Sequence, residues 1–171
     1  TENGAGIEWD ILNKQATSFS NNLDYKKATL VALEALKIAE EKAGPTHIDV
    51  ATSLDTLADI YRKQREYKKA EPLYQRALTI KENALGPDGR EVASTLTGLA
   101  SLYSEQREFA KAETIFKRVL TNDEKQWGPE SIITALTVIE LAGVYKEQGE
   151  FQKAEALYKR ALGVGERDGF I

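Results

Sequence analysis

The chain has 171 residues, of which 42% are hydrophobic and 29% charged, and its formal net charge is −4. This hydrophobic share supplies a packed core and excludes a disordered chain, while no apolar run approaches the length that crosses a bilayer. The negative charge argues against a nucleic-acid partner, which needs a concentrated basic surface, and the absence of Cys excludes disulfides and thiolate chemistry.

The N-terminus carries no signal-peptide pattern, and the sequence begins at Thr1 and contains no Met. We therefore expect a processed mature chain or a segment of something longer. The compartment stays open, with the cytoplasm slightly favoured over export to a periplasm or beyond.

A Gly-Pro pair recurs every 42 residues, at 44–45, 86–87 and 128–129, and a similar amino-acid sequence follows each pair. A fixed period of this length predicts one supersecondary unit stacked on copies of itself. We expect a single array over residues 1–171, with repeats at about 2–43, 44–85, 86–127 and 128–169.

The first repeat follows the common pattern less closely than the others. Gln15 stands where the later copies carry Leu, and Ala32 stands where they carry an aromatic residue. Terminal repeats of such arrays are commonly atypical, so we interpret this repeat as an N-terminal cap. Trp9 lies in its first helix, where the indole could shield the open end of the array.

The second repeat shows the helical pattern clearly. Its apolar residues fall on two stripes of helical spacing, separated by the short polar turn at 64–66. Two amphipathic helices joined by so short a turn pack antiparallel as a hairpin. Gly86 stops the second helix in the left-handed conformation that suits glycine, and Pro87 bars continuation.

The third and fourth repeats follow the same plan, and the three later repeats differ from one another at the hairpin turn. Arg65 and Arg107 occupy the turn position where the fourth copy has Gly149, so we expect non-glycine residues held left-handed at a cost of about 1 kcal/mol each. Trp127 is expected to pack in the loop between repeats. The last helix carries Phe151, Leu157, Leu162 and Val164, and no polar capping helix follows, so we expect this end to meet another copy, a crystal neighbour or further residues.

These residues resemble the tetratricopeptide repeat (TPR) family, whose signature places large apolar, small and aromatic residues at set offsets. The signature in the second, third and fourth copies is Leu54, Leu57, Ala58, Tyr61, Ala70, Tyr74, Ala77; Leu96, Leu99, Ala100, Tyr103, Ala112, Phe116, Val119; and Val138, Leu141, Ala142, Tyr145, Ala154, Tyr158, Ala161. The 42-residue period with Gly-Pro is similar to the kinesin light chain subgroup.

The resemblance implies an all-α, right-handed superhelix of about four helix pairs, in which the first helix of each pair lines a concave groove. It also implies a non-catalytic role, because the family holds peptide segments of other proteins in that groove. The paired asparagines that clamp peptides in kinesin light chains are absent: the matching pairs are Asn13-Lys14, Asp55-Thr56, Thr97-Gly98 and Ile139-Glu140.

The predicted groove is small and polar in the middle and apolar in the fourth repeat. Its candidate partner-binding residues are Asn13, Thr52, Asp55, Asp59, Arg62, Thr97, Ser101, Leu136, Ile139 and Lys146. Leu136 and Ile139 form an exposed binding patch, pack against a continuation of the array, or fill a tight groove. We interpret Asp55 and Asp59 as a solvated or peptide-contacting acidic face, and we expect Arg62 to pair with Asp59.

The sequence predicts no catalytic, cofactor-binding or metal-binding residues. His47 is the only histidine, and a lone histidine makes neither a triad nor a zinc site. The functional hypothesis is a scaffold or adaptor that binds a protein or peptide, without nucleic acid or membrane insertion. Two alternatives stay open: a self-assembly module that associates through the uncapped C-terminal end, and a regulatory segment of a larger enzyme or signalling protein.

Overall fold

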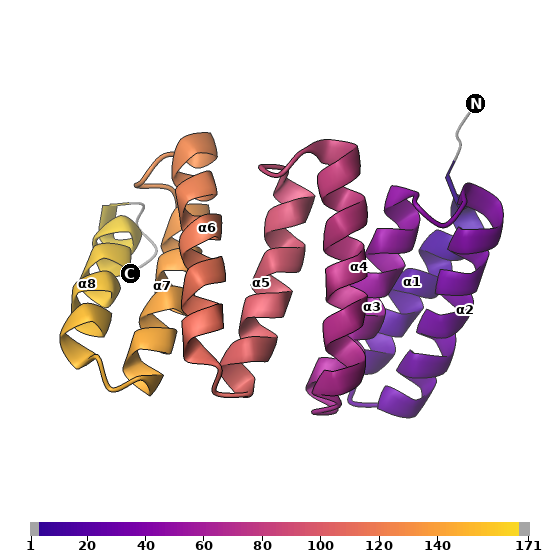
Figure 1. The fold of residues 1–171 in the computed structure, drawn as a ribbon, viewed down its shortest axis with the longest axis horizontal. Coiled ribbons are helices and arrows are strands. Elements are labelled where there is room, and N and C mark those ends of the chain that lie inside the picture. Colours follow the sequence, from indigo (N-terminus) through magenta and orange to yellow (C-terminus); the bar gives the residue numbers. More distant parts are fainter. Residues whose placement is uncertain (1–3, 168–171) are drawn as a thin grey trace. The chain divides into compact units, whose positions relative to one another are not determined.

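The computed structural model describes residues 4–167 and shows helices only within that range (Figure 1). The helices are α1 (Gly6–Asn21), α2 (Tyr25–Ala43), α3 (Ile48–Lys63), α4 (Tyr67–Leu85), α5 (Arg90–Glu105), α6 (Phe109–Trp127), α7 (Ile132–Glu147) and α8 (Phe151–Arg167). None of them is long and apolar enough to span a membrane.

The helix boundaries follow the sequence period. The first helices of the pairs, α1, α3, α5 and α7, begin at residues 6, 48, 90 and 132, and the second helices, α2, α4, α6 and α8, begin at 25, 67, 109 and 151. Each start is therefore 42 residues after its predecessor of the same kind. The structure confirms the predicted all-α fold, a helical-repeat solenoid of antiparallel pairs.

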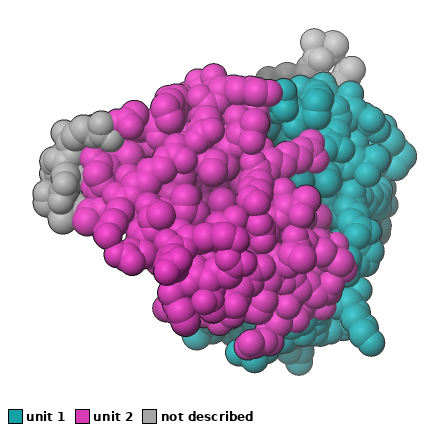
Figure 2. Space-filling view, turned by 60° about the vertical axis from the view of Figure 1, so that its left-hand side comes forward, with its two compact units in different colours: residues 1–98 teal, residues 99–171 magenta. Residues whose placement is uncertain are grey.

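The chain divides into two compact units, residues 1–98 and residues 99–171 (Figure 2). The boundary falls within α5. Each unit has its own apolar core. In the first unit, one cluster joins α2, α3 and α4 around Val50, Leu54 and Ala77, and another joins α1, α2 and α3 around Ala16, Ala32 and Leu57. In the second unit, Val138 of α7 packs with Ala161 and Val164 of α8, with Leu120 of α6 against them.

Each of α2, α4 and α6 ends at a glycine with positive φ. Gly44, Gly86 and Gly128 have φ of 91°, 82° and 85°, with ψ of 157°, 166° and 158°. This region of positive φ and extended ψ is essentially restricted to glycine. The predicted glycine stop is confirmed, although the backbone is extended rather than left-handed helical.

The turn inside each hairpin also needs a positive φ. It is supplied by Leu23, Arg65 and Arg107 at 61–63° and by Gly149 at 79°. The next N–H returns to a carbonyl of the first helix, as in Glu66 N to Tyr61 O at 2.8 Å and Glu150 N to Tyr145 O at 2.9 Å, which is the bond of a Schellman turn. The expectation that Arg65 and Arg107 are held left-handed is therefore confirmed.

The outer face of α1 differs from that of the other first helices. Gln15 and Ser18 are exposed, whereas the residues at the equivalent positions of α3 and α7 are buried; these are Leu57, Ile60, Leu141 and Val144. A polar outer face is the property of a capping element, because it removes the drive to stack another repeat.

The two tryptophans have different surroundings. Trp9 packs on the cluster around Val50, and its Nε1 donates to Ser53 Oγ at 2.6 Å, so the indole ties α1 to α3. Trp127 is exposed. It is the last residue of α6 and is 45% exposed, so its packing in the loop between repeats stays a prediction.

Candidate protein-binding surface

The candidate residues of the first unit lie on α1, α3 and the first half of α5, and most of them are held by contacts within the unit. Thr52 Oγ1 donates to Ile48 O at 3.1 Å, and Thr97 Oγ1 donates to Ala93 O at 2.9 Å. Both side chains are half-buried. Each hydroxyl therefore donates its hydrogen bond to a backbone carbonyl of its own helix.

Asp55 belongs to a buried polar cluster that joins α3, α4 and α5. Lys81 Nζ donates to Asp55 Oδ2, to Thr95 Oγ1 at 3.0 Å and to Glu91 O at 3.2 Å, and Thr95 Oγ1 donates to Asp55 Oδ2 at 2.7 Å. The Lys81 side chain is only 6% exposed. Burial raises the pKa of Asp55, and the neighbouring Lys81 ammonium opposes that rise.

Of the two interpretations of Asp55, the solvated acidic face is wrong, because Lys81 of its own helix pair and Thr95 of the next pair bind the carboxylate. A buried ion pair is costly to break from one side, since the remaining charge loses its partner. Asp55 therefore holds successive helix pairs of this unit together. Its second oxygen, Oδ1, is buried without a hydrogen-bond partner in the described structure, and so is Oδ1 of Asn13 at the equivalent position of α1.

Asp59 and Arg62 form a second polar cluster, with Tyr74 of α4. The Tyr74 hydroxyl donates to Asp59 Oδ1, and Arg62 Nη2 lies 3.4 Å from the same oxygen, which confirms the predicted pairing of Arg62 with Asp59. Burial, and then the Asp59 charge, raise the pKa of Tyr74 far above its ordinary range, so this phenol stays a proton donor. Arg62 remains half-buried at the surface of α3.

The second unit presents a different, apolar surface on α7. Leu136 is 59% and Ile139 43% exposed, and Lys146 is exposed further along the same helix, while Ser101 of α5 is half-buried. The opposite side of α7 faces α6, where Thr137 Oγ1 donates to Asp123 Oδ2 at 2.6 Å. The exposure expected for Leu136 and Ile139 is confirmed within the described residues.

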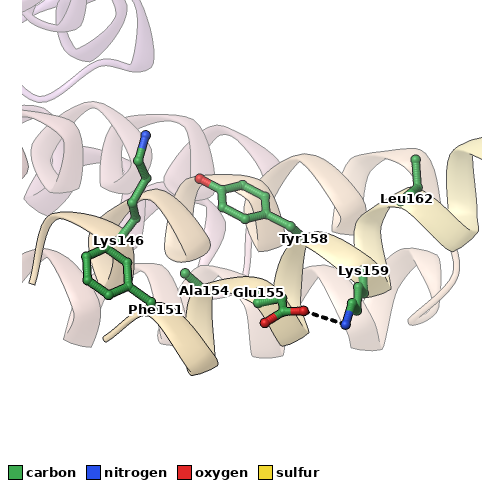
Figure 3. Close-up of a pocket in the computed structure, with 7 residues that line it drawn as sticks. All are labelled: Lys146, Phe151, Ala154, Glu155, Tyr158, Lys159 and Leu162. Carbon is green, nitrogen blue, oxygen red and sulfur yellow. Dashed lines mark hydrogen bonds and ion pairs between the residues drawn. The ribbon is translucent and has the colours of Figure 1, made fainter. Parts of the chain in front are cut away.

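A shallow pocket of about 380 Å³ adjoins this row (Figure 3). Phe151, Tyr158 and Leu162 of α8 supply its apolar lining, with Ala154, and its charged residues are Lys146, Glu155 and Lys159. A Cβ on Gly143 would lie 3.9 Å from the Tyr158 hydroxyl. This distance is an ordinary van der Waals contact, so the phenol lies against α7 between Ile139 and Lys146, and the α7 row adjoins the pocket at Gly143.

Sequence reasoning identified Leu162 and Phe151 as apolar residues of the last helix but did not place them in a pocket with Tyr158. The comparison of the repeats could have indicated this pocket. Tyr158 is equivalent to Phe116 and Tyr74, which are buried, and a residue of that kind needs a neighbouring helix to cover it.

The described residues contain no group of three or more His, Cys, Asp or Glu side chains that could hold a metal ion. His47 is the N-cap of α3, where its Nδ1 accepts from the Asp49 N–H at 3.2 Å. Asp49 Oδ2 in turn accepts from the N–H of Ala5 at 2.7 Å. Both side chains therefore form hydrogen bonds that stabilise the start of α3.

With this repeat geometry the sequence matches the Tetratricopeptide repeat family over residues 10–83, 57–125 and 91–167. The matched segments together cover most of the chain, and the protein belongs to this family. A helical repeat of this type is typically a protein-binding scaffold. A comparison with curated protein sequences finds no match.

Solved structures show the same fold. BtubC (BKLC) from P. vanneervenii is 28% identical with a TM-score of 0.84, and the alignment covers 94% of this chain and 64% of BtubC. A kinesin light chain from Podosopora anserina with nearly identical TPR-like repeats is 14% identical, with a TM-score of 0.62 and 95% and 96% coverage. Aspartyl phosphate phosphatase F from Bacillus subtilis is 17% identical with a TM-score of 0.79, and this chain spans 41% of it.

Proposed function

We propose that this chain is a non-catalytic scaffold that binds a protein or peptide on the exposed faces of its first helices. The observation that carries the proposal is the row of exposed apolar side chains on α7, Leu136 and Ile139, which continues through Gly143 toward the pocket beside α8. Contiguous exposed apolar surface rimmed by charge is typical of a protein-interaction site. The net charge of −4 favours a protein partner over nucleic acid.

The polar part of the proposed surface lies in the first unit and consists of Asn13, Thr52, Asp55, Asp59, Arg62 and Thr97. Thr52, Asp59, Arg62 and Thr97 each keep partial exposure, so a bound segment can contact them beside the internal hydrogen bonds that hold them. In the second unit the proposed contacts are Ser101, Leu136, Ile139 and Lys146.

The test compares partner capture by the intact chain, by the double variant Leu136→Asp and Ile139→Asp, and by the control Leu30→Asp. Leu30 is an exposed leucine on α2, outside the proposed surface. A partner that binds through α7 should be captured by the wild type and the control and lost from the double variant. Equal recovery of every captured protein by all three chains, with unchanged helicity by circular dichroism, would contradict the proposed surface.

A second candidate function is self-assembly. It is favoured by the exposed apolar residues of α8, which are Phe151, Tyr158 and Leu162. In that case variants on α8 would change the oligomeric mass, while Leu136→Asp would leave it unchanged.

A further inference from the structure

The two hairpin turns of the first unit, between α1 and α2 and between α3 and α4, lie next to each other on one edge (Figure 1). Lys63 at the end of α3 reaches the end of α1, where its Nζ donates to Ser20 Oγ at 3.3 Å and to Asn21 Oδ1 at 3.2 Å. Gln64 Nε2 donates to Thr29 Oγ1 of α2 at 3.2 Å. The exposed surface of residues 20–27 and 62–69 is called the turn edge below.

The turn edge is strongly basic, whereas the equivalent turns of the second unit are neutral. Residues 20–27 and 62–69 together contain seven Lys and Arg and two Asp and Glu, which gives a net charge of +5. The equivalent residues 104–111 and 146–153 contain four Lys and Arg and four Glu, which gives a net charge of zero. The positive charge is therefore a property of the first two hairpins and not of the repeat itself.

Two positions of the repeat account for the whole difference. At the second residue of the second helix, the first unit has lysine and the second unit has a neutral residue: Lys26 and Lys68 against Ala110 and Gln152. At the last residue of the first helix, the second unit has glutamate and the first unit does not: Asn21 and Lys63 against Glu105 and Glu147. Lys26, Lys63 and Lys68 are all exposed.

The lysine at the next position has a structural role that all four hairpins share. It forms an ion pair with the acidic residue three positions before it and lies over an aromatic ring of the first helix; these lysines are Lys27, Lys69, Lys111 and Lys153. In contrast, Lys26, Lys63 and Lys68 form no ion pair within residues 4–167, and Lys63 donates to neutral oxygens. Their charges are therefore available to a ligand.

Helix stability does not explain Lys26 and Lys68. Each lies in the first turn of its helix, where the helix dipole disfavours a cation, and each directly precedes another lysine. Residues that break a local preference without a structural gain are expected at functional sites. Both lysines therefore indicate an anionic partner.

The residue before each of these lysines differs between the units in the same way. Tyr25 and Tyr67 begin α2 and α4, whereas phenylalanine begins α6 and α8. Both tyrosines are half-buried, and each adds a hydroxyl that can donate a hydrogen bond to a carboxylate. The segment Tyr-Lys-Lys-Ala thus occurs twice, at 25–28 and 67–70, on two adjacent turns.

We propose that the turn edge binds an acidic segment of another protein, whose Asp and Glu side chains pair with Lys26, Lys63 and Lys68. Carboxylates are the acceptors that ammonium and phenol donors bind most strongly in proteins. The turn edge lies in the first unit and differs in chemistry from the apolar row on α7, so this inference does not rest on the function proposed above.

An acidic protein segment fits this surface better than the two other common polyanions. Nucleic acid needs a larger basic surface, and the chain as a whole has a net charge of −4. A helix or loop that anchors on a bilayer combines basic residues with a broad apolar face. Leu23 is the only large apolar side chain that is exposed on the turn edge, whose residues are all described.

The first test measures the fluorescence anisotropy of a labelled oligoglutamate peptide with the intact chain. The double variant Lys26→Gln and Lys68→Gln introduces the residue that the fourth repeat has at this position. The control Lys14→Gln and Lys37→Gln removes the same charge from exposed lysines of α1 and α2 outside the turn edge. The double variant should bind about threefold or more weakly than the wild type, and the control should bind like the wild type.

The affinity of the wild type should fall as the salt concentration rises from about 0.05 to about 0.3 M, and an oligoglutamine peptide of the same length should not bind. Equal weakening in the double variant and the control would show that only net charge matters and would overturn the proposal. A wild-type chain without saturable oligoglutamate binding below about 1 mM would overturn it as well.

The second test gives the turn edge the charge of the second unit. The variant Asn21→Glu, Lys26→Gln, Lys63→Glu and Lys68→Gln places at each position a residue that the fourth repeat carries there, and it should lose oligoglutamate binding. Cosedimentation with phosphatidylserine vesicles tests the other occupant. Vesicle binding that this variant loses, without oligoglutamate binding by the wild type, would assign the edge to a membrane and overturn the proposal.

These measurements are independent of the proposed binding of a protein at Leu136 and Ile139. The variant Leu136→Asp and Ile139→Asp should bind oligoglutamate like the wild type, so failure at one surface leaves the other untouched. Circular dichroism of every variant checks that the helices are intact.

Discussion

At the scale of single residues, small side chains let large ones pack between helices. Gly98 of α5 illustrates this, because a Cβ built on it would lie 2.7 Å from Cε1 and 3.0 Å from Cζ of Tyr74. Tyr74 is buried and its hydroxyl is bound by Asp59, so the ring is not free to move away. The helix therefore carries a glycine in its interior despite the lower helix propensity of that residue.

Gly98→Ala should destabilise the protein by about 1–3 kcal/mol, since the added methyl group forces Tyr74 or the backbone to shift. Gly163→Ala in α8 is the matched control, because nothing lies within 4 Å of its Cβ position. The control should gain up to about 1 kcal/mol from helix propensity. Urea unfolding followed by circular dichroism measures both, and a gain in stability for Gly98→Ala would refute the close contact.

Glu113 is the residue whose charge should give a pH-dependent contribution to stability. Lys117 chiefly, together with the Tyr145 hydroxyl at 3.1 Å and Gln148, lowers the pKa of Glu113 below its ordinary value. A lowered carboxyl pKa stabilises the fold above the unfolded-state pKa, and this contribution is lost as the pH falls through the folded-state pKa.

Glu113→Gln should therefore be less stable than the wild type by about 0.5–1 kcal/mol near neutral pH, and the two should converge at about pH 3 or below. Urea unfolding at several pH values measures the difference. Glu41→Gln serves as the control, because the pair of Glu41 with Lys37 is exposed at 3.8 Å and should matter little. A constant difference between wild type and Glu113→Gln across the whole range would show that charge is not the cause.

At the scale of elements, the hairpin turn is the part that the sequence specifies least well. Three of the four turns use Leu23, Arg65 or Arg107 where positive φ favours glycine, and only the fourth uses Gly149. The Schellman hydrogen bonds are present in all four hairpins. The geometry of the turn therefore outweighs the preference of these non-glycine residues for negative φ. A left-handed conformation costs a non-glycine residue about 1 kcal/mol.

Arg65→Gly should consequently stabilise the protein by up to about 1 kcal/mol, and the reciprocal change Gly149→Arg should destabilise it by a similar amount. Both residues are exposed, so packing contributes little to either change. The midpoints of urea unfolding give the two shifts. Shifts of the same sign for both variants would contradict the explanation by backbone strain.

The helices themselves could be predicted from sequence because each apolar stripe has helical spacing and each repeat confirms the others. Individual side-chain partners could not. The sequence places Asp55 on the groove side of α3, and only the structure shows that Lys81 and Thr95 reach it from the next two helices. Such contacts depend on the separation between helices, which periodicity does not specify.

At the scale of the whole molecule, the outer faces of α1 and α8 differ in polarity. The outer face of α1 carries polar Gln15 and Ser18, whereas α8 retains exposed Tyr158 and Leu162. Apolar side chains that are exposed to water favour association with another protein, whereas a polar helix face does not. We therefore expect association of this chain to involve α8 rather than α1.

Changing α1 into an ordinary first helix should make its outer face associate as well. The double variant Gln15→Leu and Ser18→Ile gives this face the residue types of Leu57 and Ile60, which are buried where α3 packs on α2. Both positions of α1 are exposed, so the two substitutions create an exposed apolar patch. Sedimentation of the double variant should show a mass that grows with concentration more steeply than that of the wild type, whereas the polar control Gln15→Asn and Ser18→Thr should behave like the wild type. A double variant with the wild-type mass at every concentration would show that Gln15 and Ser18 do not limit association.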